Sequence, residues 1–205
     1  MVTKKQLIML KKLLIGTAIC IGMVAFTNSL KAQKITKEEL KLMQKSMNDS
    51  LNSVNYLARQ AKLEELLAKP PATCGLESID GLAINTKTMI DEQKKTNDLL
   101  KTYVGNLTVS SEGETTQQAG KKVALGDVVQ LSSNIINQIT AAANALLGIT
   151  AVAGDVTKVS PMKIGVAKKS IVYTKDALVG LGSQLSSELN IVKQLQTYAQ
   201  ATKNM

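Results

Sequence analysis

Aliphatic side chains recur every seven residues after Pro161, and this spacing constrains the fold more than any other feature of the sequence. The repeated positions are Ile164, Ile171, Leu178, Leu185, Val192 and Ala199. The companion positions are Ala167, Thr174, Leu181 and Leu195, and Glu188 interrupts that set. Such three-and-four spacing places side chains on one stripe of a helix, the seam along which long helices pack. A helix over 161–203 would be roughly 60 Å long at 1.5 Å per residue, and it cannot bury that stripe without partner helices.

Three further helices are predicted upstream, at about 36–68, 76–104 and 122–158. Thr36 and Glu39 fit a capping box at the start of the first helix, and Pro70 and Pro71 end it. The helices at 122–158 and 161–203 are joined by a three-residue connection that ends in Ser160 and Pro161, a typical cap and first helical residue. This short connection predicts an antiparallel hairpin.

The helix at 76–104 has a strongly polar middle, residues 91–98, so we expect it to be the least buried of the four. Within that middle, Asp91 and Lys95, and likewise Lys94 and Asp98, are four residues apart and can pair on the wet side. Gly81 would allow a short break. The following stretch, 105–121, has no apolar period and is predicted to be an exposed loop, with a hairpin beginning at 107–109 as the alternative.

Aromatic residues make up only 2% of the chain, which favours an all-α fold. Phe26 is the single phenylalanine, and a core without large rings is filled with aliphatic side chains that suit helix–helix packing. All-β folds draw on alternating aromatic and β-branched runs, which are missing here. The sequence therefore predicts an elongated antiparallel bundle of about four helices, forming a single domain over residues 33–205 and ending in a long C-terminal hairpin.

Residues 1–32 resemble a secretory signal peptide. Basic residues precede an apolar run over 13–26 and a polar stretch, and the run is shorter than the ~20 residues that span a bilayer. We expect cleavage after Ala32, which leaves Gln33 as the new terminus; cleavage after Ser29 and an uncleaved membrane anchor are the alternatives. The mature protein would then be periplasmic or secreted.

Removal of the signal peptide changes the charge balance. The net charge of +9 loses five lysines and no acid, so 20 basic residues remain against 16 acidic ones, or +4. These charges are interspersed and aromatic residues are scarce, so nucleic acid is not expected as a partner.

No charged residue lies between Asp127 and Asp155, a stretch long enough to cross a membrane. It contains Asn134, Asn137 and Asn144, however, and each unpaired amide costs several kcal/mol in hydrocarbon. A bundle helix with a surface of Ala, Ser and Asn is the favoured interpretation. Membrane insertion after a conformational change, and contact with another subunit through the small residues, are the alternatives.

The residues needed for common catalytic chemistry are missing. Without histidine the chain lacks the usual general base and the commonest zinc ligand. Cys74 is the only cysteine beyond the signal peptide, so we expect no internal disulfide; it is interpreted as a small loop residue or as an intermolecular contact. Gly180 and Gly182 fit no phosphate loop and are expected to thin the helix for packing or to allow a bend. We therefore predict no enzyme activity, no cofactor and no metal.

The function predicted from these observations is that of an exported, non-catalytic interaction or structural component of the cell envelope. Its partners would be proteins, including further copies of the chain. Small periplasmic helical subunits of secretion and conjugation machines share this outline, although no motif assigns the chain to them. The alternative is a membrane-active or pore-forming effector that uses the hairpin of residues 122–203.

Overall fold

The structure is a computed structural model that describes residues 35–107 and 123–203. The described residues form five α-helices and two short 3₁₀ helices, with no strand among them. In chain order these are α2 (Lys37–Leu51), α3 (Val54–Ala68), α4 (Glu77–Gly105), α5 (Leu125–Val152), η2 (Ala153–Lys158), η3 (Pro161–Lys163) and α6 (Ile164–Lys203). The all-α fold predicted from the spacing and the scarcity of aromatic residues is confirmed.

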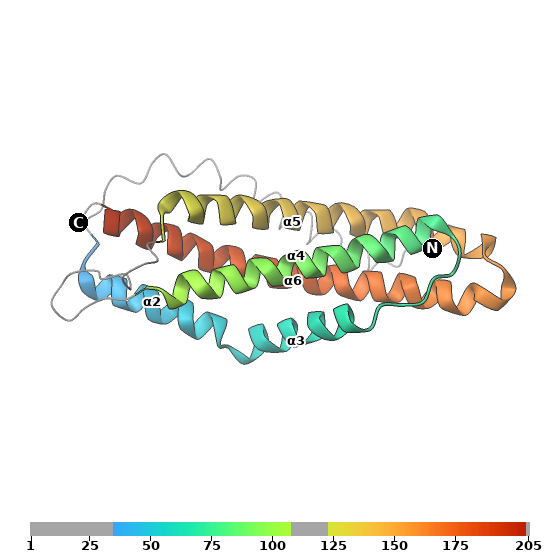
Figure 1. Ribbon diagram of the computed structural model, residues 1–205, viewed down its shortest axis with the longest axis horizontal. Helices are drawn as coiled ribbons and strands as arrows, with labels where there is room; N and C mark the ends of the chain where they lie inside the picture. Colours follow the sequence, from blue (N-terminus) through green and yellow to red (C-terminus); the bar gives the residue numbers. More distant parts are fainter. Residues whose placement is uncertain (1–34, 108–122, 204–205) are drawn as a thin grey trace, which may run out of the picture. The chain divides into compact units, whose positions relative to one another are not determined.

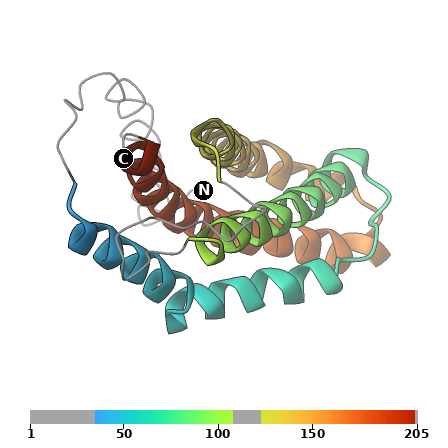
Figure 2. The ribbon, with the colours of Figure 1, turned by 60° about the vertical axis from the view of Figure 1, so that its left-hand side comes forward.

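Helix α6 is the element against which the others pack. It contacts α2, α3, α4 and α5, and α5 also packs against α4. Figures 1 and 2 show α5 on one side of the α4–α6 pair and α2 with α3 on the other. The seven-residue stripe is buried as predicted at Leu178, Leu185, Val192 and Ala199, whereas Ile164 and Ile171 are only half-buried.

The predicted first helix is divided into α2 and α3 at Asn52 and Ser53, which corrects the expectation of one helix over 36–68. The Ser53 hydroxyl accepts a hydrogen bond from the Tyr56 amide at 3.3 Å and donates to the Ser50 carbonyl at 2.9 Å. These bonds replace helical backbone bonds, which is why serine and asparagine favour helix ends. The predicted capping box of Thr36 and Glu39 is present at the start of α2.

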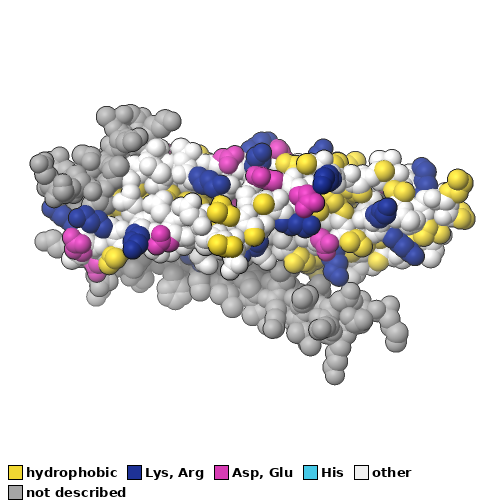
Figure 3. Space-filling view, turned by 90° about the horizontal axis from the view of Figure 1, so that it is seen from below, with side chains coloured by type: hydrophobic (Ala, Val, Ile, Leu, Met, Phe, Trp, Pro, Cys, Tyr) yellow, Lys and Arg dark blue, Asp and Glu magenta, His cyan; other side chains and the backbone are white. Residues whose placement is uncertain are grey.

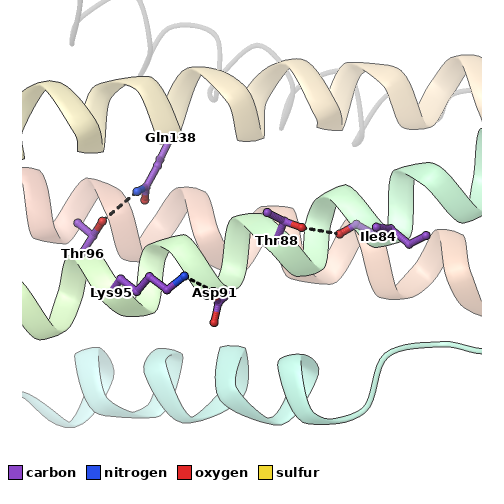
Figure 4. Close-up of polar contacts among 6 residues, drawn as sticks. All are labelled: Ile84, Thr88, Asp91, Lys95, Thr96 and Gln138. Carbon is purple, nitrogen blue, oxygen red and sulfur yellow. Dashed lines mark hydrogen bonds and ion pairs between the residues drawn. The ribbon is translucent and has the colours of Figure 1, made fainter.

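Helix α4 corrects the expectation that this would be the least buried helix. It runs unbroken through Gly81, and its buried side chains follow a three-and-four spacing. They are Ile79, Ala83, Thr86, Ile90, Gln93, Thr96, Asn97, Leu100 and Val104. The ion pair of Lys95 with Asp91 does form on the wet side, with Nζ and Oδ2 2.6 Å apart (Figure 4). The polar middle of α4, residues 91–98, thus has one face in solvent and one face inside the bundle.

The ends of the predicted hairpin also differ in detail from the sequence expectation. Helix α5 stops at Val152 and continues as the 3₁₀ helix η2, while η3 supplies a single tight turn before α6. Of the predicted loop at 105–121, Gly105 belongs to α4 and Leu107 is buried. The Leu107 carbonyl accepts a hydrogen bond from the Gln44 side chain of α2. The rest of that loop, 108–121, lies outside the described residues.

Gly180 lets α3 approach α6 closely, as expected for a glycine that thins a helix for packing. A Cβ at this position would lie 3.3 Å from Cδ2 of Leu63, a side chain with no exposed surface. At Gly81 of α4, by contrast, an added Cβ meets nothing within 4 Å.

We expect Gly180→Val to destabilise the protein by about 1–3 kcal/mol, because the branched side chain must displace Leu63. Gly81→Val is the matched control and should be neutral or slightly stabilising, because valine has a higher helix propensity than glycine. Urea unfolding of both variants measures the difference. Equal stability of the two variants would show that α3 does not rest on Gly180.

Candidate functional site

Six polar side chains from three helices meet inside the bundle, and we call them the polar cluster. They are Tyr56 and Gln60 of α3, Gln93 and Asn97 of α4, and Gln184 and Glu188 of α6. None is more than 5% exposed. Each lies within the buried stripe of its helix, so the packing that buries the leucines also buries these polar groups.

The amide groups of Gln93 and Gln184 donate to two acceptors, Oε1 of Gln60 and one oxygen of Glu188. Oε1 of Glu188 accepts from Nε2 of Gln93 at 2.5 Å and from Nε2 of Gln184 at 3.4 Å. The Tyr56 hydroxyl lies 3.3 Å from the same oxygen and 2.5 Å from Oδ1 of Asn97. Because a hydroxyl has one proton, the shorter distance indicates that Tyr56 donates mainly to Asn97.

The other oxygen, Oε2 of Glu188, has no hydrogen-bond partner among the described residues. Burial raises the pKa of Glu188 to about 7, although the donors on Gln93, Gln184 and Tyr56 and the charge of Lys101 act in the opposite direction. Burial, followed by the negative charge of Glu188, likewise raises the pKa of Tyr56. The carboxyl group therefore changes charge near neutral pH inside a largely uncharged interior.

The polar cluster offers little for catalysis in this conformation. Glu188 has no exposed surface, so no substrate can reach it. No group of three His, Cys, Asp or Glu side chains that could hold a metal ion occurs within residues 35–107 and 123–203. What the cluster can do is link three helices through hydrogen bonds and bind or release one proton.

A groove opens on the surface next to the polar cluster. It has a volume of about 600 Å³ and lies between α2 and α6, with the first turns of α3 at one end. Tyr56 and Arg59 belong to its lining. Arg59 donates from Nε to Oε1 of Gln184 at 3.2 Å and from Nη2 to Oγ of Ser187 at 2.8 Å. Gln184 thus lies between the surface guanidinium and the buried Glu188.

The outer side of α5, which faces away from α4 and α6, is a second candidate binding surface. Helix α5 packs on α4 and α6, and Gln138 donates to Oγ1 of Thr96 at 2.9 Å (Figure 4). On the opposite side Val129 and Leu147 are 48% and 40% exposed, among small polar residues. By length and composition, Leu125–Lys158 could cross a membrane, and only 17% of its most apolar window is buried. Figure 3 shows, for comparison, the face of the molecule that carries α2 and α3, where acidic and basic side chains are intermixed.

None of the site residues predicted from sequence belongs to the polar cluster. Ala32 and Gln33, the predicted cleavage site, lie outside the described residues. Cys74 is 2% exposed and packs with Ile79, Val152, Val159 and Ala167 at the end of the bundle where α5 turns into α6. Apolar side chains gather at this end in Figure 3. An intermolecular disulfide through Cys74 would need this region to open, and that contact stays a prediction.

We expect Cys74 to be a slow-reacting thiol in the folded protein. Burial raises its pKa, and its sulfur is shielded from reagents, so little reactive thiolate is accessible. The measurement is the rate of reaction with Ellman's reagent. Full reaction should require denaturant, and rapid reaction under native conditions would show that this end of the bundle opens readily.

Sequence reasoning missed the polar cluster, although the signal for it was present. Glu188 stands at a companion position of the α6 stripe, and Gln93 and Asn97 continue the spacing set by Ile90 and Leu100. The polarity of Gln93 and Asn97 suggested a solvated surface, whereas the positions of all three residues pointed to the interior.

These features define a class: an all-α protein with a polar cluster at its centre and, at its side, a partly apolar helix that carries no charge beyond Asp127. Comparison with protein-family models, curated proteins and solved structures finds no match for the chain.

Proposed function

We propose that the chain is an exported, non-catalytic component of the cell envelope that binds a protein partner through the outer side of α5. The observation that carries this proposal is the absence of charge between Asp127 and Asp155 on a helix whose outer side faces away from the bundle. Cores of protein interfaces are depleted in charged residues, and small side chains allow another helix to approach closely. The predicted signal peptide over residues 1–32 supports export.

Several residues make the α5 surface suited to a protein partner. Val129 and Leu147 offer apolar contact, and Asn137 and Asn144 are exposed between them on the same side. A protein surface can satisfy such amides with hydrogen bonds, whereas hydrocarbon cannot. A periplasmic subunit of a secretion or conjugation apparatus is one setting that would use such a surface.

The test places a photo-crosslinking amino acid at Asn144 of α5 and, as a matched control, at Ala61, an exposed position of α3. In cells that make the full chain, we expect a discrete crosslinked product from Asn144 only. Adding Asn137→Lys to the chain that carries the crosslinker at Asn144 should reduce that product at least tenfold, while Asn55→Lys on α3 should not. Equal products from both crosslinking positions, or none, would contradict the proposal.

A membrane-active protein is the second candidate, favoured by the length and apolar composition of Leu125–Lys158. Liposomes loaded with a fluorescent dye separate the two candidates. Release of the dye by the mature protein supports insertion of the α5 hairpin, and retention supports a protein partner. Export is tested separately: N-terminal sequencing of the processed protein should begin at Gln33.

A further inference from the structure

Two cationic side chains, those of Arg59 and Lys45, line the groove between α2 and α6. Arg59 is the only arginine in the chain, and Lys45 lines the α2 side. Neither takes part in an ion pair within 4.0 Å in the part of the chain that the structure describes. Asp49 also lines the groove, so its lining carries a net charge of +1 from two cations and one anion.

Arg59 is held in place rather than free to move with solvent. Two of its N–H donors are engaged by Gln184 and Ser187 of α6, which fixes the plane of the guanidinium. An arginine has five such donors in a rigid fork that fits the oxygens of a carboxylate or phosphate. A guanidinium fixed in this way loses little side-chain entropy when an anion binds, so it is a good anchor for one.

The serines of the groove offer acceptors rather than donors. The hydroxyls of Ser50, Ser53 and Ser187 donate to carbonyls of their own segments, those of Ser46, Ser50 and Ser183, at 2.8, 2.9 and 3.1 Å. Of the two lone pairs on each serine oxygen, one is used at Ser53 by the Tyr56 amide and one at Ser187 by Arg59, so each of these oxygens can accept one further hydrogen bond from a ligand. The carboxylate of Asp49 adds a stronger acceptor, and the 65%-exposed Leu42 adds an apolar contact.

We propose that this groove binds an acidic sugar, a ligand with one carboxylate or phosphate group on a ring that carries several hydroxyls. The anionic group pairs with Arg59 and Lys45. The sugar hydroxyls donate to the serine oxygens and to Asp49, and the carbon side of the ring lies against Leu42. A volume of about 600 Å³ accommodates one or two sugar rings.

The test is isothermal titration of the mature full-length protein with four probes: glucose 6-phosphate, glucuronate, glucose and inorganic phosphate. We expect at least one acidic sugar to bind with a dissociation constant of about 1 mM or lower. Glucose and inorganic phosphate should each bind at least about tenfold more weakly, because each offers only half of the matching groups. Absence of binding by both acidic sugars overturns the proposal.

Two variants locate the site. Arg59→Lys keeps the charge but removes the forked N–H donors of the guanidinium. Lys45→Gln removes an exposed charge that makes no ion pair with a described residue. Both variants should weaken acidic-sugar binding at least about tenfold. Lys87→Gln on α4, outside the groove, is the matched control and should leave binding unchanged. Lys45→Gln keeps the test decisive if the arginine variant unfolds. Binding that survives both groove variants, or phosphate that binds as tightly as glucose 6-phosphate, overturns the proposal.

Discussion

The folded protein should be less stable at pH 8 than at pH 5, by up to about 3 kcal/mol. The pKa of Glu188 is raised from 4.5 to about 7 by burial, so the folded state holds a proton that the unfolded state has already released. Stability is therefore greatest below pH 4.5 as far as this group is concerned, and it falls as the pH rises towards and through 7. A shift of one unit corresponds to about 1.4 kcal/mol, which sets the size of the effect.

Few other described groups contribute to the change in stability between pH 5 and pH 8. The chain has no histidine, and the pKa values of Glu39 and Asp91 are lowered by hydrogen bonds with Thr36 and Lys95, so both titrate below pH 5. The charge of Lys101 of α4 acts on the carboxyl group, and Arg59 of α3 is linked to it through Gln184. Any gain in stability as the pH rises towards 5 comes from acids with a lowered pKa, such as Glu39 and Asp91, whereas the fall in stability from pH 5 to pH 8 comes from Glu188.

Urea unfolding at pH 5, 6, 7 and 8 measures the effect, and Glu188→Gln is its control. The amide keeps the shape of the side chain but cannot ionise, so the fall in stability should disappear. At pH 8 this variant should be more stable than the wild type by an amount on the order of 1–3 kcal/mol, because a buried carboxylate with one unpartnered oxygen is replaced by a neutral group. A wild-type stability that does not change from pH 5 to pH 8 would show that Glu188 is solvated or paired in solution.

Leu195→Ala should cost about 3–5 kcal/mol of stability and lower the melting temperature by roughly 10 °C. Leu195 has no exposed surface and lies at a companion position of the stripe on α6, the helix that contacts α2, α3, α4 and α5. The loss combines the transfer free energy of the removed atoms with a cavity that neighbouring helices cannot close.

The matched control makes the same substitution where the leucine is exposed. Leu42 of α2 is 65% exposed, so Leu42→Ala should change stability by no more than about 0.5 kcal/mol. Differential scanning calorimetry of both variants provides the comparison. A similar loss in the two would mean that the α6 stripe is not the centre of the core.

Much of the fold followed from spacing alone. The seven-residue repeat predicted α6 and its need for partners, and Pro70, Pro71 and Pro161 predicted where helices end. These features act locally: a proline blocks its own turn, and a stripe of leucines on one helix is unfavourable in water whatever its neighbours are. The division of the first helix at Ser53 was harder to foresee, because serine occurs within helices as well as at their ends, and packing decides whether it becomes a cap.

The tertiary structure determined which polar residues are buried. In the sequence, Gln93 and Asn97 belong to a charged, hydrophilic stretch, and Glu188 interrupts an apolar pattern. Only the packing of α3, α4 and α6 shows that these side chains face one another. The hydrogen bonds between them offset the free-energy cost of burying their polar groups. The sequence by itself determined the helices and their apolar seam. The arrangement of those helices determined that a titratable carboxyl group lies at the centre, because its position depends on which polar side chains from different helices meet.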